Sequence, residues 1–498
     1  ESYLLVAMAS RDKNRPNVLV VMTDDQGAWA LGCAGNSEIR TPHLDGLAER
    51  GVRFENFFCA SPVCSPARAS FLTGRIPSQH GVHDWIRKGN ISDPNGEYRG
   101  VDRPIEYLEG MLGYTDVLKQ NGYACGLSGK WHLGAQETPQ KGFDYWYAFA
   151  FGGGDYYDSP MVENGSLRKK SDYLTDVITD GALKFLGEID EAEDPFYLSV
   201  HYTAPHSPWN KGNHPDAFLE LYEDCPFSSC PDQKVHPWQI NSAPVGVGER
   251  RQENLQGYFA AVTAMDAGVG RLLERLDTLG LRDNTLIVFT SDNGMNMGHH
   301  GIWGKGNGTY PQNMYDSSVK VPFIVSHLGC VPQGKVESGL FSHYDFFPTL
   351  LDYLGMENPL ANELPGRSFA ALFEGKPLTG RENVVVFDEY GPVRMIRNRN
   401  FKYVHRFPEG PHEFFDLQVD PNEVTNVVDD PDYQGLVDEM RLDLENWFRN
   451  YVDPSVDGST EPVTGKGQLD WVGKKSGDRQ RYSGEFSFYH EVGDEFES

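Results

Sequence analysis

Residues 17–25 read NVLVVMTDD, an apolar, β-branched run that ends in the polar cluster Thr23-Asp24-Asp25. A continuous apolar run predicts a strand covered on both faces, as in a parallel sheet sandwiched between helices. In such a sheet the binding crevice lies beyond the carboxyl ends of the strands, so polar clusters in that position converge. Three other stretches have the same form: YACGLSG before Lys130-Trp131-His132, PFYLSVHYTAP before His206, and TLIVFTS before Asp292-Asn293-Gly294.

The segments between and after these runs complete the predicted fold. Residues 257–280 carry apolar side chains at three- and four-residue spacing, which predicts a helix with one buried face and Gly280 near its end. After about residue 380 the chain shows short alternating strands and then one amphipathic helix, before a Gly- and charge-rich, irregular tail from about Asp457. We therefore predict an α/β protein with two domains. Residues 11–380 would form a large, mostly parallel sheet sandwiched by helices, and residues 381–498 a smaller antiparallel sheet plus helix.

The composition limits the partners. Among 498 residues, 44 Lys and Arg stand against 72 Asp and Glu, a net charge of −28 that argues against nucleic acid or an anionic membrane as a partner. No apolar run approaches the ~20 residues that span a bilayer. The initial ESYLLVAMAS lacks the basic start and long apolar stretch of a signal peptide, which favours the cytoplasm. Processing ahead of Glu1 would leave the periplasm or secretion open.

The seven cysteines are too sparse for a disulfide scaffold, and none has the spacing of a zinc site. Cys225 and Cys230 would either close a short loop or remain free thiols.

Two of the polar clusters offer hard oxygen ligands. Carboxylates and an amide from separate strand ends suit Ca²⁺ or Mg²⁺ better than zinc. The alternative is that these side chains only cap loops. The predicted ligands are Asp24, Asp25, Asp292 and Asn293.

The stretch SPVCSPARASFLTGR, residues 61–75, predicts an anion site. Pro66 suits the first turn of a helix, whose free backbone N–H groups and positive dipole end would face Cys64. Arg68 follows one turn later on the same side. A thiolate nucleophile at Cys64 would need an oriented histidine partner, and the nearby sequence supplies none.

These residues resemble the signature of the type I sulfatases, in which the cysteine of C-x-P-x-R is oxidised to formylglycine. Further similar motifs occur in the family's order along nearly the whole chain. They are Thr73-Gly74-Arg75, Asp24-Asp25, Gly129 to Gly134, Thr203 to His206, Ser291 to Gly294, Gly304-Lys305-Gly306, Phe415-Asp416-Leu417 and Asp420-Pro421.

The resemblance implies an alkaline-phosphatase-like fold and a maturation enzyme that converts Cys64 to formylglycine. It also implies one divalent ion, usually Ca²⁺ and otherwise Mg²⁺, held by the four predicted ligands. One hydroxyl of the hydrated aldehyde would attack sulfur. Loss of a proton from the other hydroxyl would then expel sulfate without attack by water.

The resemblance further implies roles for nearby side chains. Arg68, Lys130 and Lys305 would surround the sulfate oxygens, and His132 would assist proton removal. His206 and Lys305 would protonate the leaving oxygen. His300 resembles a position that lines the pocket. The pocket would be built from loops, here residues 85–110, 150–170, 207–250 and the tail.

We expect the substrate to be a small sulfated saccharide, of glycosaminoglycan type, cleaved from its end, because the acidic chain repels a long polyanion while its pocket is cationic. Asp84, Trp85 and Arg87 are the predicted sugar contacts, although Trp85 would equally suit a core. Two alternatives stay open. One is a formylglycine-type phosphonate monoester or phosphodiester hydrolase, and the other is a non-catalytic protein that binds sulfated glycans through an unmodified Cys64.

Overall fold

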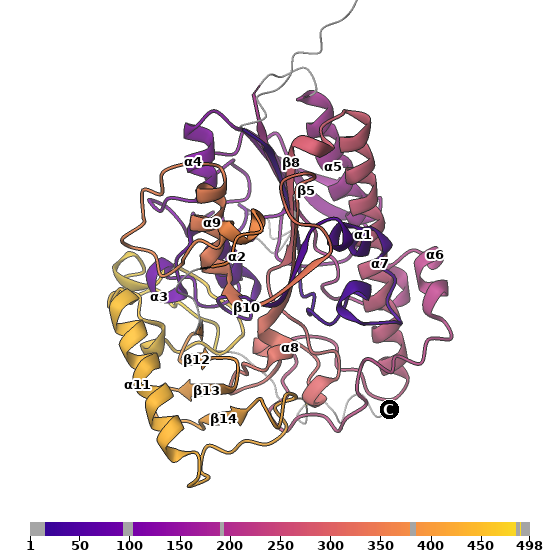
Figure 1. Ribbon diagram of the computed structural model, residues 1–498. Coiled ribbons are helices and arrows are strands. Elements are labelled where there is room, and N and C mark those ends of the chain that lie inside the picture. Colours follow the sequence, from indigo (N-terminus) through magenta and orange to yellow (C-terminus); the bar gives the residue numbers. More distant parts are fainter. Residues whose placement is uncertain (1–14, 93–102, 190–193, 379–384, 485–488, 490–498) are drawn as a thin grey trace, which may run out of the picture.

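The computed structural model describes residues 15–92, 103–189, 194–378, 385–484 and 489. A large sheet runs through its centre with helices on both faces, and a small sheet with one long helix lies at one end (Figure 1). The strands of the large sheet are β1 (Asn17–Thr23), β2 (Val52–Phe58), β3 (Ala124–Lys130), β4 (Tyr145–Phe149), β5 (Ser159–Glu163), β6 (Ser166–Lys170), β7 (Phe196–His201), β8 (Thr285–Ser291), β9 (Lys320–Ser326) and β10 (Lys335–Ser342).

The strand order in the described part of this sheet is β10-β2-β9-β8-β1-β7-β3-β4-β5-β6. The four strands predicted from their apolar runs lie side by side as β8-β1-β7-β3, and the three pairings among them are parallel. Antiparallel pairing is confined to β9 and to β5 and β6 near one edge. The predicted fold class, a large and mostly parallel sheet between helices, is confirmed.

Strand β1 explains why the sheet is covered on both faces. All seven of its residues are buried. Because successive side chains point to opposite faces, Val18, Val20 and Met22 join one apolar core, and Leu19 and Val21 join the other. The run NVLVVM therefore supplies two cores at once, which a half-exposed strand could not do.

Helices complete the two cores. One core includes α2 (Cys64–Thr73), α4 (Tyr114–Gln120) and α9 (Phe346–Tyr353), and the other includes α1 (Pro42–Glu49), α5 (Leu174–Glu188) and α7 (Glu249–Thr278). Figure 1 shows these two groups on opposite sides of the sheet. The helix predicted within residues 257–280 is confirmed as part of α7. Shorter helices are α3 (Pro77–His80), α6 (Asp216–Leu219), α8 (Asp316–Val319) and α10 (Ala370–Phe373).

The small sheet is antiparallel, as predicted. Its strands, in spatial order, are β11 (Val386–Tyr390), β12 (Val393–Arg397), β13 (Phe401–Arg406) and β14 (Glu413–Asp416), and the long helix is α11 (Gln434–Tyr451). Phe387, Ile396 and Tyr403 pack with Val437 and Phe448 of α11 in a third apolar core.

The segment after α11 returns to the large sheet. Gln468 pairs with Ile86 in a parallel bridge, and Val463, Val472 and Tyr482 belong to the same buried cluster as β2 and α9. The division of the chain at residues 380 and 381 stays a prediction, because that boundary lies outside the described residues.

Two further expectations can be compared with the described residues. All seven cysteines, including Cys225 and Cys230, are free thiols. Within the described ranges, no helix combines the length and the apolar character that crossing a membrane requires.

Candidate active site

Cys64 lies at the bottom of a cavity of about 2000 Å³. It is the first residue of α2, with Val63 as the N-cap and Pro66 in the first turn. Asp25, His132, His206 and Lys305 line the same cavity. The sequence pattern therefore placed the helix start correctly to within two residues, and Cys64 itself belongs to the first helical turn.

The two predicted pairs of metal ligands meet because β1 and β8 are parallel neighbours. Thr23 lies opposite Ser291, so Asp24 and Asp292 follow at the same sheet edge. Single ligand atoms of Asp24, Asp25, Asp292 and Cys64 all lie within 4.8 Å of one another, and all four residues are buried.

This group of side chains fits a divalent cation. The four predicted ligands offer carboxylate and amide oxygens, which hard cations prefer. Asn293 donates through Nδ2 to Asp25 Oδ1 at 2.9 Å, whereas its Oδ1 is buried without a hydrogen-bond partner. A buried acceptor without a donor costs free energy, and a cation would satisfy it.

Three buried cations pair with the three carboxylates. Arg68 donates through Nε to Asp292 Oδ2 at 2.8 Å. Lys130 contacts Asp24, and Lys305 contacts Asp25. We call the group the floor of the cavity, although only Asp25, Cys64 and Lys305 line the cavity directly and the other members are buried. Its members are Asp24, Asp25, Cys64, Arg68, Lys130, Asp292, Asn293 and Lys305.

The formal charges of the floor cancel, so a bound divalent cation would leave two positive charges in excess. Burial opposes the ionisation of Asp292, but the charge of Arg68 and then of Lys130 holds its pKa well below the usual value. Burial and the charge of Asp292 raise the pKa of Asp24. A floor that holds a divalent cation is therefore suited to attract an anion.

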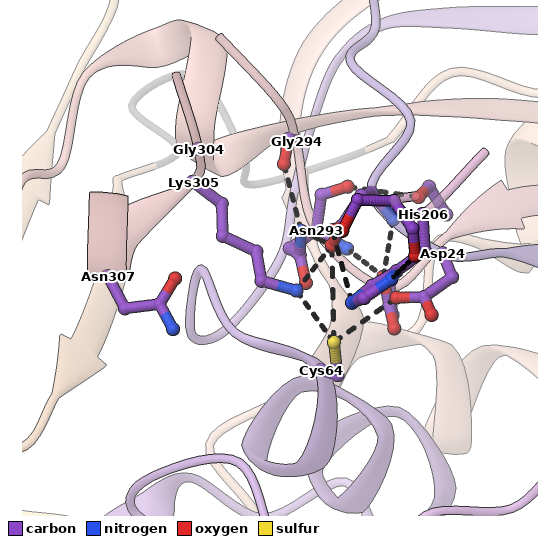
Figure 2. Close-up of polar contacts among 12 residues, drawn as sticks. Asp24, Cys64, His206, Asn293, Gly294, Gly304, Lys305 and Asn307 are labelled. Carbon is purple, nitrogen blue, oxygen red and sulfur yellow. Dashed lines mark hydrogen bonds and ion pairs between the residues drawn. The ribbon is translucent and has the colours of Figure 1, made fainter. Parts of the chain in front are cut away.

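The sulfur of Cys64 lies among these charges. Lys305 Nζ donates to Sγ at 2.7 Å, and Sγ donates to Asp24 Oδ1 at 3.1 Å. Figure 2 shows the Lys305 side chain extending to the sulfur, which lies at the start of a helix. Burial, followed by the charge of Asp24, raises the pKa of the thiol.

Two histidines line the cavity with one ring nitrogen already engaged. His132 donates through Nε2 to the carbonyl of Ile86 at 2.9 Å, and its Nδ1 is buried without a partner. His206 donates through Nδ1 to the carbonyl of Ser207 at 2.6 Å. Its Nε2 lies 3.7 Å from Asp25 Oδ2. In each histidine the second nitrogen is left to exchange a proton.

Two glycines that sequence reasoning missed hold these rings. A Cβ atom on Gly152 would lie 2.1 Å from His132 Cε1, and one on Gly153 would lie 2.6 Å from His206 Cε1. Real Cβ atoms do not approach so closely, so any side chain here would displace a ring. The run Phe151-Gly-Gly-Gly-Asp155 was the available signal.

The three predicted sugar contacts differ in whether they line the cavity. Trp85 and Arg87 line the cavity, whereas Asp84 does not. Asp84 is fully buried, because its carboxylate accepts hydrogen bonds from Tyr390 Oη at 2.6 Å and from the backbone N–H groups of Trp85 and Gly467 at 2.9 Å. These donors hold Asp84 in the interior, and its role as a sugar contact stays a prediction.

His300 is not among the residues that line the cavity, and its role there stays a prediction. Its ring stacks on Tyr315 with centroids 3.8 Å apart, outside the cavity wall. The left-handed backbone of His300, with φ of 57°, turns the chain at this point.

All four predicted loop regions contribute to the cavity, within the described residues. Residues 93–102 of the first loop lie outside that part of the chain. Lys88, Asn307 and Lys466 line the cavity without having been singled out in the sequence. The tail is held in place by the carbonyl of Gly465, which accepts from Trp85 Nε1 at 3.1 Å and from Asn307 Nδ2 at 3.2 Å.

Comparisons with known proteins agree with this geometry. The Sulfatase family profile matches residues 16–356, and the profile described as N-sulphoglucosamine sulphohydrolase, C-terminal, matches residues 298–450. The chain is 28% identical to N-acetylglucosamine-6-O-sulfatase of Bacteroides thetaiotaomicron, over 92% of this chain and 90% of that protein. It is 31% identical to an ulvan-active sulfatase of Formosa agariphila, over 87% of this chain and 81% of that protein.

Solved structures show the same fold. One, in complex with its substrate D-glucosamine-2-N,6-O-disulfate, has a TM-score of 0.74 and 26% identity and covers 90% of this chain and all of its own. The phosphonate monoester hydrolase of Agrobacterium radiobacter, at 22% identity and a TM-score of 0.68 over 87% of this chain and 96% of its own, shares the fold alone. The chain belongs to the sulfatase family, as a type I sulfatase of the alkaline phosphatase superfamily, and it is a sulfuric ester hydrolase.

Proposed function

We propose that this protein hydrolyses a sulfate group, either an O-sulfate or an N-sulfate, on a small carbohydrate. The reaction would take place at residue 64. The observation that carries the proposal is the position of Cys64 Sγ, at the bottom of the cavity and in contact with Lys305 and Asp24. The named activities of the sulfatase relatives, which include an N-acetylglucosamine-6-O-sulfatase and an ulvan-active sulfatase, support a carbohydrate substrate.

Sulfatases of this family use a metal ion and formylglycine. We assign the metal to Asp24, Asp25, Asp292 and Asn293, and we propose Ca²⁺ before Mg²⁺, because Ca²⁺ tolerates the irregular geometry of an all-oxygen site. A formylglycine at residue 64 would supply, once hydrated, a hydroxyl nucleophile in place of the thiol. Its formation requires a maturation enzyme as a partner.

The cations of the floor would bind the sulfate group. Arg68, Lys130 and Lys305 are nearly or fully buried, so their charges are weakly screened by solvent. Fixed charges in a dry site stabilise charge that develops on transferring oxygens without reorganisation. Their carboxylate partners keep them in position before the substrate arrives.

The two histidines would move protons on either side of the reacting group. His132 Nδ1 carries a free lone pair, because Nε2 holds the proton that it donates to Ile86, and it would accept a proton from the group at residue 64. In its doubly protonated form, His206 would donate the Nε2 proton to the leaving oxygen and keep the Nδ1 proton on the Ser207 carbonyl, with Lys305 as a second donor, since both side chains border the cavity.

A saccharide panel tests this proposal. The matured protein would be assayed with sulfated mono- and disaccharides that differ only in the position of the sulfate, with long sulfated polymers, and with aryl sulfates. We expect the highest kcat/KM on one of the small saccharides. Rates no higher than on the polymers or aryl sulfates would contradict a carbohydrate substrate. Faster turnover of phosphodiesters than of any sulfate would favour the phosphonate-type alternative.

The chemical state of residue 64 is a separate test. Peptide mass analysis distinguishes the aldehyde from the thiol, because the conversion changes the residue mass. We expect the aldehyde in active material. Activity in a sample that holds only the thiol would contradict the role of formylglycine, and a wholly unconverted, inactive native protein would favour the binding alternative.

A further inference from the structure

One wall of the cavity carries positive charge without carboxylate partners. Arg87, Lys88 and Lys466 line it, and we call these three residues the cationic wall. Arg87 and Lys88 follow the signature helix in sequence, whereas Lys466 comes from the tail. The two segments are joined by the backbone hydrogen bonds between Arg87 N–H and the Gln468 carbonyl at 2.9 Å and between Gln468 N–H and the Trp85 carbonyl at 2.8 Å.

The partners of the cationic wall are neutral. Arg87 Nη1 donates to Ser483 Oγ at 2.8 Å, and Lys466 Nζ donates to the carbonyl of Asn241 at 3.2 Å. Among the described residues, no carboxylate forms an ion pair with Arg87, Lys88 or Lys466, whereas Lys169 on another part of the cavity pairs with Asp158 at 3.3 Å. No direct ion pair within the described residues therefore offsets the charge of the wall.

The arrangement costs free energy in the absence of a ligand. Lys466 is half-buried, and burial, followed by the nearby charge of Arg87, lowers the pKa of its ammonium group. The nearest opposing charge is that of Asp84, which is already engaged by three donors. A bound anion would remove the repulsion between the two cations and would accept hydrogen bonds from both.

We infer that Arg87 and Lys466 form a second anion subsite, which binds a further sulfate or carboxylate of the saccharide whose scissile sulfate lies on the floor. This inference rests on the proposed function. The subsite adjoins the reaction centre, because Arg87 directly follows Ile86, whose carbonyl accepts the hydrogen bond of His132. The substrate class is thus a short saccharide with at least two anionic groups.

Binding energy at this subsite comes from a part of the substrate that does not react. Such energy raises kcat/KM for substrates that carry the second anion. One charge-assisted contact is enough for about a tenfold difference. We expect the matured enzyme to prefer a dianionic over a monoanionic saccharide by at least that factor.

The experiment compares three saccharides with the same scissile sulfate. The first carries no other anion, the second a further sulfate, and the third a uronic carboxylate, so that the two sources of charge are distinguished. The measured quantity is the ratio of kcat/KM for each dianionic substrate to that for the monoanionic one. We expect the double variant Arg87→Gln/Lys466→Gln to bring this ratio close to one.

A charge-matched control separates the subsite from overall charge. Lys184→Gln/Lys376→Gln removes two positive charges outside the cavity and should keep both the activity and the ratio. Arg87→Lys retains charge and should keep part of the preference. In the unaltered enzyme, raising NaCl from about 0.05 to about 0.5 M should lower the ratio, because the wall is open to solvent.

The outcomes distinguish the two levels of the proposal. No turnover of any sulfated saccharide by matured enzyme would contradict the proposed function itself. Turnover with equal kcat/KM on all three saccharides, or a preference that survives both the double variant and high salt, would overturn the second subsite while leaving the proposed function intact. If the double variant unfolds, the salt series and Arg87→Lys still decide the question.

Discussion

The floor and the cationic wall use the same types of side chain in opposite ways. On the floor every cation contacts a carboxylate, and these residues are nearly or fully buried. On the wall, Arg87 and Lys88 are exposed, and Arg87 and Lys466 donate to neutral partners. An unpaired charge buried in the floor would have a high free-energy cost. On the wall, solvent stabilises such a charge. The comparison separates residues suited to chemistry from residues suited to selecting a substrate.

The largest effect is expected at the centre of the floor. Cys64→Ala removes the precursor of the nucleophile, and turnover should fall by about 10⁴-fold or more. Steady-state kinetics on the preferred saccharide measures the loss. Cys330→Ala, which alters an exposed thiol, serves as the control and should leave turnover unchanged. Comparable loss in both variants would contradict the assignment.

A second change removes a charge partner from the floor. Asp292→Asn leaves the buried guanidinium of Arg68 without its carboxylate, which should cost about 3 to 5 kcal/mol of unfolding free energy. Chemical denaturation measures this loss, and calorimetry should show weaker Ca²⁺ binding. Asp176→Asn breaks an exposed pair with Arg271 and should cost less than about 1 kcal/mol. Equal costs would remove the distinction between buried and exposed charges.

Asp84 lies next to the wall, where it accepts a hydrogen bond from the backbone N–H of Gly467, and we expect its titration to affect stability. Burial, which outweighs its hydrogen bonds, raises the pKa of Asp84 from 3.8 to about 6. The folded protein therefore binds this proton more tightly than the unfolded chain, so its contribution to stability falls as pH rises from about 4 to about 6. The change amounts to at most roughly 3 kcal/mol.

Asp84→Asn should abolish this part of the pH dependence. Urea denaturation at about pH 4.5 and pH 7 would compare the two proteins, with a smaller loss of stability expected in the variant. The charged and titratable groups near Asp84 are Lys466, Tyr390 and Tyr482. The same pH dependence in both proteins would show that Asp84 does not carry the effect.

The smallest effect concerns the positioning of the histidines. Gly153→Ala should lower kcat by about 10- to 100-fold, because the added methyl group displaces His206. Gly154→Ala is the matched control, since its Cβ would meet only Phe149 at an ordinary 3.8 Å. Steady-state kinetics on the preferred saccharide, with kcat and KM determined separately, should show the loss in kcat. Equal kcat in both variants would exclude a positioning role for Gly153.

The centre of the fold could be predicted because its signals are local. Each apolar run, such as residues 17–22, ends in its own polar cluster, and parallel neighbours bring their carboxyl ends to one edge. The predicted ligands Asp24 and Asp292 meet for that reason. The motif around Cys64 likewise contains the helix start, the proline and the arginine within five residues.

The surroundings of the floor could not be predicted in the same way. Asp84 and Arg87 lie three residues apart, yet one is buried and the other exposed, because the donors that bury Asp84 include Tyr390 and Gly467 from distant segments. His300 follows the metal motif closely in sequence but stacks on Tyr315 outside the cavity. Proximity in sequence does not specify which way a loop turns.

The sequence by itself determined the sheet, its active edge and the chemical types gathered there, since strand periodicity and the direction of parallel strands depend on neighbouring residues. Only the tertiary structure decided which side chains surround the floor. The return of the tail past Ile86 places Lys466 beside Arg87, and the close approach of Gly152 and Gly153 holds two rings. Those contacts depend on how remote segments pack, and packing is settled by the whole chain.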